Sequence, residues 1–311
     1  MRYIFLLLLF AVSACDISPS EKEEKLSEDP AEQVPAKVKD GEHKKESVLP
    51  PIKHLVFAGD TVPLDNPEVR ERLEYELISN KYRHSRTIII LKRINRWRPM
   101  IDTILENRNI PKDFIYMAVA ESELDNDARS HAGAVGMWQF MQGTGKEYGL
   151  KSDRHMDERK HPLKSTRAAT RYLTNAYKKF DNWSLVAASY NMGMSGVKRA
   201  MDVQNADNYY DLYLNPETSR YVFRILAFKI ILENPEAFGF NIPEDELYQP
   251  WNVTTDTVDN TISDLNEYAA SKGLNYNLLR YYNPWLDDYR QCRLRLGRKE
   301  TAVFWLPKKE E

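Results

Sequence analysis

The sequence predicts a mainly helical protein that ends in a small α+β module. Between residues 65 and 235, apolar residues recur at intervals of three and four, as on one face of a helix, and no alternating strand pattern interrupts them. After Pro250 the pattern changes to short alternating stretches on either side of two short helical ones. The 311 residues therefore divide into an N-terminal leader, a large helical body and a small C-terminal module.

The first fifteen residues, MRYIFLLLLFAVSAC, predict a secretory signal. Arg2 precedes an apolar run that is too short for an ordinary membrane span. The run ends in VSAC, residues 12–15, which resembles the bacterial lipobox, whose cysteine is lipidated and becomes the mature N-terminus. We therefore expect residues 1–14 to be a signal peptide and Cys15 to carry lipid. An ordinary signal cleaved nearby, without lipid, is the alternative.

Residues 15–55 predict a lipidated N-terminus followed by a disordered tether. Residues 16–50 contain no aromatic residue and are rich in Lys, Glu, Asp, Pro and Ser. Such a segment buries too little apolar surface to offset the entropy that it loses on ordering. Charged linkers extend, so this one would let a lipid-anchored body reach a target away from the membrane.

The helical body opens with two apolar stretches. After Pro67, which suits a first helical turn, apolar residues recur at every fourth position. The second stretch, residues 88–97, combines isoleucines with arginine and lysine at a spacing that favours a helix over a buried strand. Pro99 is expected to break or kink this helix, and residues 100–105 to start another.

Three further helices are expected before residue 235. An amphipathic stripe runs from Thr166 to Phe180, with Ser165 or Thr166 as its cap. Shorter helices are expected at 183–190 and 221–232.

The C-terminal module is expected at residues 241–311. Residues 251–255 alternate like a strand, and two short helices follow near 262–269 and 278–282. A final strand ends near residue 306. The order β-α-α-β is that of a small, separate module.

Glu121 is the candidate acid of the body. Phe114, Met117 and Ala118 lie at positions i, i+3 and i+4 of one helix face. Glu121 follows on that face at i+7. A carboxyl group at the end of an apolar stripe is desolvated, which raises its pKa toward the range of a general acid. Glu123 is turned by about 200° from Glu121 and is expected on the opposite, wetter side.

A series of short motifs follows in order along the chain. They are Glu121-Ser122, Ala128-x-Ser130, Gly133-Ala134-x-Gly136-x-Trp138-Gln139-Phe140, Tyr148-Gly149-Leu150, Asp157-Glu158-Arg159, Ala188-Ser189-Tyr190-Asn191-Met192-Gly193 and Glu217-Thr218-x-x-Tyr221-Val222. Together they resemble the soluble-lytic-transglycosylase domain over residues 56–240, especially in membrane-bound lytic murein transglycosylases of the D type. The resemblance implies a lysozyme-like (goose-type) helical catalytic domain, with residues 241–311 as a LysM-like module.

The resemblance also implies a reaction. Enzymes of this family cleave the β-1,4 bond between N-acetylmuramic acid (MurNAc) and N-acetylglucosamine (GlcNAc) in peptidoglycan. Glu121 would protonate the glycosidic oxygen and then accept the proton of the MurNAc C6 hydroxyl, which attacks the anomeric carbon. The product is a 1,6-anhydro-MurNAc end. Because the nucleophile belongs to the substrate, the second carboxylate that most glycosidases use is not required.

Six residues match substrate-binding positions of the family: Ser130, Gln139, Tyr190, Asn191, Glu217 and Tyr221. Several have a structural alternative: the tyrosines as core residues, the serine as a cap or turn residue, and the two amides as braces of loops. Trp138 is expected in the core rather than as a sugar platform.

The expected partners are peptidoglycan strands and, through the lipid anchor, a membrane. No cofactor is expected, and no metal, because the six histidines show no metal-ligand spacing. The net charge of -2 argues against nucleic acid as a partner. We expect a monomer in the bacterial cell envelope, facing the periplasm. The alternatives are a lysozyme-like hydrolase with the same acid and a non-catalytic peptidoglycan-binding lipoprotein.

Overall fold

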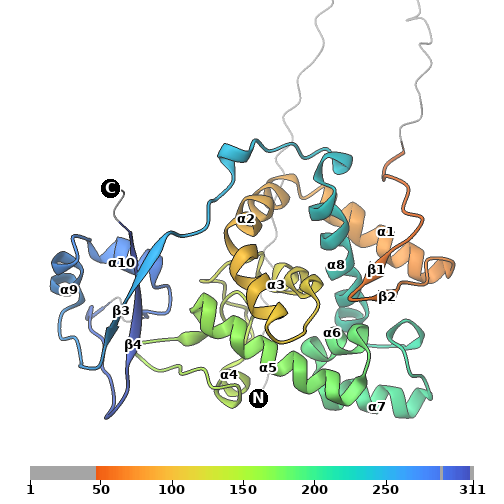
Figure 1. Ribbon diagram of the computed structural model, residues 1–311. Helices are drawn as coiled ribbons and strands as arrows, with labels where there is room; N and C mark the ends of the chain where they lie inside the picture. The colour runs from red at the N-terminus through yellow and green to blue at the C-terminus, as the bar shows by residue number, and fades with distance from the viewer. Residues whose placement is uncertain (1–46, 288–289, 309–311) are drawn as a thin grey trace, which may run out of the picture. The chain divides into compact units, whose positions relative to one another are not determined.

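The computed structural model describes residues 47–287 and 290–308 (Figure 1). The predicted signal peptide, the lipidation site at Cys15 and most of the predicted tether lie outside these residues. Residues 47–55, which we assigned to the tether, contact the folded body. Leu55 is buried, and Lys81 donates a hydrogen bond to the carbonyl of Val48 at 2.7 Å. The ordered chain therefore begins before the predicted end of the tether.

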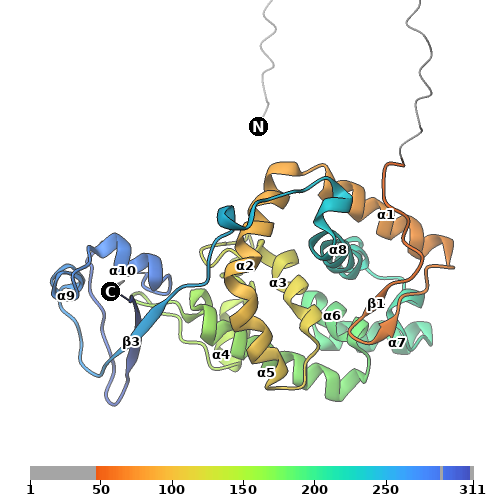
Figure 2. The same ribbon diagram turned by 45° about the horizontal axis from the view of Figure 1, so that its top comes forward.

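The body consists of eight α-helices within the described residues, which confirms the mainly helical prediction (Figure 1). A short hairpin, β1 (Val56–Phe57) and β2 (Asp60–Thr61), precedes α1 (Pro67–Lys81), α2 (His84–Glu106), α3 (Ile115–Ser122), α4 (Gln142–Glu147), α5 (Pro162–Phe180), α6 (Trp183–Met192), α7 (Met194–Gln204) and α8 (Pro216–Glu233). The short helix α3 lies between α2 and α8 in both views (Figures 1 and 2). The apolar faces of these helices form one core.

The prediction that Pro99 separates two helices is wrong, because α2 runs through it without a break. Proline lacks a backbone N–H and so removes one helix hydrogen bond. Trp97, Ile101 and Leu105 are buried on either side of Pro99. Their packing against the core keeps both halves of the helix in one line.

The start of α5 also differs from the prediction. The helix begins at Pro162, and Ser165 and Thr166 are buried inside it rather than capping it. Their hydroxyls donate to the carbonyls of His161 and Pro162. Helices α4 and α7 were not predicted, since each has a single buried residue and therefore no apolar stripe.

The C-terminal module has the predicted order β-α-α-β. Strands β3 (Val253–Val258) and β4 (Ala302–Pro307) pair antiparallel, and α9 (Leu265–Ser271) and α10 (Tyr276–Tyr282) lie between them in the chain. The buried Phe304 of β4 belongs to a core that the two helices cover.

The module and the body are in contact. Met156 of the body packs into the core of the module. The buried ammonium group of Lys160 pairs with Asp287 at 2.7 Å and with Asp127 at 3.4 Å. Trp305, in turn, packs against the core of the body. The chain from residue 47 onward is accordingly one compact unit.

Among the helices of residues 47–287 and 290–308, none combines the length and the apolar character that crossing a membrane requires.

Candidate active site

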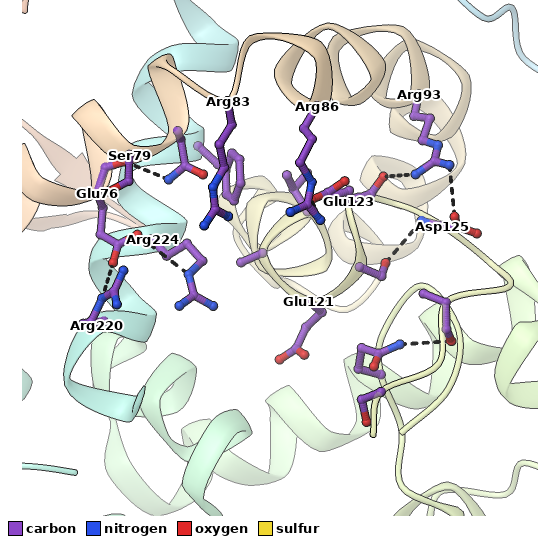
Figure 3. A pocket seen from close by; sticks show the side chains of 18 of the residues that line it. Glu76, Ser79, Arg83, Arg86, Arg93, Glu121, Glu123, Asp125, Arg220 and Arg224 are labelled. Carbon is purple, nitrogen blue, oxygen red and sulfur yellow. Dashed lines mark hydrogen bonds and ion pairs between the residues drawn. The ribbon is translucent and has the colours of Figure 1, made fainter. Parts of the chain in front are cut away.

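A cavity of about 530 Å³ lies at the C-terminal end of α3 (Figure 3). Its walls come from α1, the first half of α2, the loop that follows α3, and α8. Three of the predicted site residues line it: Glu121, Ser130 and Gln139.

Glu121 is half-buried at the end of α3, and Phe114, Met117 and Ala118 of the same helix face are fully buried, as the spacing predicts. Burial raises the pKa of the Glu121 carboxyl from 4.5 to about 7. The Tyr221 hydroxyl donates to its Oε1 at 2.5 Å, and this hydrogen bond opposes the rise in pKa. The site therefore holds a carboxyl group that exchanges a proton near neutral pH.

Glu123 and Glu121 point to opposite sides of the end of α3, as the spacing predicts (Figure 3). Helix α3 ends at Ser122, and Glu123 has a left-handed backbone with φ 57. The expectation of a wetter side is incomplete, because Glu123 is ion-paired there. Glu123 lines the same cavity and pairs with Arg86 at 2.5 Å.

Ser130 and Gln139 both line the cavity and brace the loop that carries them. The Ser130 hydroxyl accepts a hydrogen bond from the backbone of Ala134 at 3.0 Å. Gln139, whose φ is 48, donates to the carbonyls of Ala128 at 3.2 Å and Gly136 at 2.8 Å. The loop is thus held in one shape by the side chains that face the cavity.

Arg159 holds the same loop from its other side. Its buried guanidinium forms a two-point ion pair with Asp157, at 2.9 and 2.7 Å. It also donates to the carbonyls of Gly133 and Phe140. Gly136 lies against the Arg159 carbonyl so closely that an added Cβ would be 2.0 Å from its oxygen.

Tyr190 and Tyr221 lie on the inner side of the site, next to Glu121. Burial, followed by the negative charge of Glu121, raises the pKa of both phenols well above 10, so both remain hydrogen-bond donors. Tyr190 donates to the carbonyl of Trp138 at 2.8 Å. Trp138 itself is fully buried, which confirms that it is a core residue.

Asn191 and Glu217 are not among the residues that line the cavity and pair with each other, although the charge of Glu217 contributes to the raised pKa of Glu121. The Asn191 amide donates to Glu217 Oε1 at 3.2 Å and accepts from the Thr218 hydroxyl at 2.6 Å. These contacts join the end of α6 to the first turn of α8. The structure therefore places four of the six predicted binding residues near the Glu121 carboxyl group and the other two at a neighbouring helix junction.

Six arginines line the cavity, and the sequence analysis identified none of them: Arg83, Arg86, Arg93, Arg129, Arg220 and Arg224. They come from α2, from α8 and from two loops, so no single motif in the sequence joins them.

Of the four acids in the cavity lining, three are ion-paired with these arginines. Glu76 pairs with Arg220 at 2.6 Å, and Asp125 pairs with Arg93 at 3.0 Å. Glu123 is held by Arg86, as described above. Glu121 instead accepts its hydrogen bond from a neutral phenol.

In the part of the chain that the structure describes, no group of three or more His, Cys, Asp or Glu residues could hold a metal ion.

Two protein families match this chain. Residues 99–212 match the family described as "Transglycosylase SLT domain", and residues 254–310 match "Soluble lytic transglycosylase C-terminal LysM-like domain". Glu121 and the loop that follows it lie within the first match.

Two curated relatives align with parts of the chain. "Membrane-bound lytic murein transglycosylase D" of Escherichia coli K12 is 32% identical over 205 residues, 63% of this chain and 44% of that protein. "Putative tributyltin chloride resistance protein" of Alteromonas sp. strain M-1 is 33% identical over 110 residues, 35% of this chain and 53% of that protein. The chain thus spans less than half of the first relative's length and about half of the second's.

Two solved structures are also similar in part. An inactive mutant of the lytic transglycosylase Slt from Pseudomonas aeruginosa is 24% identical, with a TM-score of 0.35, and covers 49% of this chain and 26% of its own. The 70 kDa soluble lytic transglycosylase of Escherichia coli is 19% identical, with a TM-score of 0.37, and the match covers 50% of this chain and 27% of that one. The two family matches agree with the resemblance that the motifs suggest: residues 99–212 match a transglycosylase SLT domain, and residues 254–310 match a LysM-like domain of soluble lytic transglycosylases.

Proposed function

We propose that this chain is a lytic transglycosylase that cleaves the MurNAc-GlcNAc β-1,4 bond of peptidoglycan and leaves 1,6-anhydro-MurNAc ends. The observation that carries the proposal is Glu121, a half-buried carboxyl group with a pKa of about 7 at a cavity of the SLT domain. Such a pKa suits a group that gives and takes a proton in one reaction cycle at neutral pH.

In the first step, the protonated Glu121 carboxyl donates its proton to the glycosidic oxygen as the bond from that oxygen to MurNAc C1 breaks. The C6 oxygen of the same MurNAc forms a bond to C1, and its proton passes to the Glu121 carboxylate. GlcNAc leaves with a free 4-hydroxyl, and Glu121 is protonated again. No water is consumed. The Tyr221 hydroxyl donates to the carboxylate form and stabilises it between the two transfers.

The ion pairs of the other cavity acids support a mechanism with one carboxyl group. An inverting hydrolase needs a second carboxylate to activate water on the opposite face of the sugar. Glu76, Glu123 and Asp125 are each paired with an arginine, which engages the oxygens that such a carboxylate would need to bind a water. A hydrolase that used Glu121 would add one water at each cut. Mass spectrometry of the products released from purified peptidoglycan distinguishes the two reactions.

We further propose residues 56–240 as the catalytic domain and 241–311 as the LysM-like module, in a monomer that faces the periplasm. A lipid on Cys15 would attach it to a membrane of the cell envelope. The basis is the VSAC motif at residues 12–15, together with the name of the Escherichia coli relative as membrane-bound.

Cys15→Ala is expected to release the protein from membranes into a soluble form that keeps its activity toward isolated peptidoglycan. The lipid attaches to this thiol, whereas Glu121 lies more than a hundred residues further on. Fractionation of cells into membrane and soluble proteins measures the change. A variant that stays in the membrane fraction after its signal has been cleaved would refute the lipid anchor.

The rate is expected to fall about tenfold for each pH unit above about 7, because only protonated Glu121 can start the reaction.

In Tyr221→Phe the Glu121 carboxylate loses a hydrogen bond, which raises the pKa of Glu121 and moves this fall in rate to higher pH. Tyr213→Phe, at a side chain 89% exposed, is the matched control. Profiles of kcat/KM from pH 5 to pH 10 measure both. An unchanged profile for Tyr221→Phe would contradict the role of this phenol.

A further inference from the structure

Five of the arginines that line the cavity with Glu121 come from the helices around it, and we name them the arginine wall: Arg83, Arg86, Arg93, Arg220 and Arg224. They belong to the corner between α1 and α2, to α2, and to α8 (Figure 3). None lies within residues 99–212, which match the SLT domain. The wall is therefore a feature that the flanking helices add to the cavity.

The arginine wall holds more positive charge than its acids neutralise. Its five guanidinium groups share the cavity with the carboxylates of Glu76, Glu123 and Asp125, so two positive charges remain while Glu121 is protonated. Arg220 and Arg224 share the buried Glu76, with Arg220 at 2.6 Å and Arg224 at 3.8 Å. Arg83 has no side-chain hydrogen bond or ion pair with any residue that the structure describes. The uncompensated charge consequently centres on Arg83 and Arg224.

The side chains of Arg83 and Arg224 both point into the cavity that holds Glu121 (Figure 3). Arg83 is exposed, and the Arg224 side chain is 31% exposed, so a bound molecule can reach both. Arg224 is close enough to Glu121 for its charge to lower the pKa of that carboxyl group. An anion bound at the wall would offset this effect and favour the protonated acid.

We propose that Arg83 and Arg224 bind a carboxylate of the peptide stem attached to MurNAc, so that the preferred substrate is stem-bearing peptidoglycan rather than bare glycan. The proposal rests on the proposed function. Hydroxyl and N-acetyl groups of the sugars are neutral and offer no counter-charge to two guanidinium groups. A carboxylate does, because it accepts two parallel hydrogen bonds from one guanidinium. The stem carries several carboxylates, whereas a strand without stems has only the lactyl carboxylate, which is bound as an amide while the stem is attached.

The test compares three substrates with the full-length protein in detergent. They are glycan strands with stems, the same strands with the stem carboxylates converted to amides, and strands from which an amidase has removed the stems. The variants are Arg83→Gln and Arg83→Lys, with Arg199→Gln as control at an exposed arginine of α7 outside the cavity. Arg83→Gln is expected to raise KM for stem-bearing strands about tenfold and to leave kcat unchanged. Arg83→Lys keeps the charge but not the two-point geometry, so we expect an intermediate KM.

On amidated strands, Arg83→Gln is expected to change KM less than twofold. An equal rise in KM on amidated and stem-bearing strands, or no rise on either, would overturn carboxylate binding at Arg83. A rise as large on stripped strands as on stem-bearing ones would show that Arg83 does not select the stem carboxylate, and would overturn the stem proposal. Failure of the unsubstituted protein to cleave any of the three strands would instead count against the proposed function.

Discussion

Glu121→Gln is expected to abolish the release of anhydro-muropeptides and to leave the fold intact. The amide keeps the shape of the side chain but cannot deliver a proton to the glycosidic oxygen. Contributions of general acids and bases are about 100-fold to 10,000-fold. Chromatography of the products released from purified peptidoglycan measures the loss. Activity above about a hundredth of the unsubstituted protein would contradict the assignment of Glu121.

Glu123→Gln is the matched control, since this glutamate lies two residues further on and lines the same cavity. Its pair with Arg86 is partly exposed, with 25% of the Glu123 side chain and 57% of the Arg86 side chain accessible. Pairs of this kind are worth about 1 kcal/mol or less. We therefore expect nearly full activity. An equal loss in both variants would mean that cavity charge, rather than proton transfer by Glu121, limits the reaction.

The same Glu121→Gln variant should be more stable than the unsubstituted protein above pH 7. The pKa of Glu121 is about 7 in the fold and about 4.5 when the chain unfolds. Between these pH values the unfolded chain loses its proton first, so the stability of the unsubstituted protein falls as pH rises. At about 1.4 kcal/mol per pKa unit the difference reaches about 3 kcal/mol at most. Urea unfolding at pH 4.5 and pH 8 measures it.

Gly136→Ala is expected to destabilise the protein by about 4 kcal/mol or more and to remove activity with it. The new Cβ would lie 2.0 Å from the carbonyl oxygen of Arg159, a backbone atom that cannot simply rotate away. The backbone of this residue also has a φ of 84, which residues other than glycine rarely adopt. Relief of the clash must displace Arg159 or the loop that places Ser130 and Gln139 in the cavity. Thermal unfolding and product release measure the two effects.

Gly133→Ala separates the clash from the backbone strain. Gly133 belongs to the same loop and has a φ of 87, but an added Cβ there meets no atom within 4 Å. Only the strain remains, about 1–2 kcal/mol. Equal losses of stability at the two glycines would show that the Arg159 contact is not the cause.

Elements with a long apolar stripe could be predicted from the sequence, and those without one could not. The stripes give α1, α2, α5, α6 and α8, and the buried face that carries Glu121. Helix α4 is glycine-rich, and α7 buries only Val197, so local contacts rather than periodicity decide both. Pro99 was misjudged because the cost of one lost hydrogen bond is local, whereas the packing that outweighs it is tertiary.

The candidate site also has one part that could be predicted from the sequence and one part that could not. Motifs close together in the sequence identify Glu121 and the loop with Ser130 and Gln139. The ion pair of Glu123 could not be predicted, because its partner Arg86 belongs to α2, which meets the end of α3 only in the fold. The arginine wall was missed because its members come from helices that meet only in the fold.

Cleavage of purified peptidoglycan in ¹⁸O-labelled water tests the central claim most directly. The account predicts products that are lighter than the corresponding hydrolysis products by one water and that contain no ¹⁸O, because the C6 oxygen of the substrate attacks C1. Products with a reducing end and one ¹⁸O atom at C1 would show that water is the nucleophile. That result would contradict transglycosylation by Glu121 and identify a hydrolase.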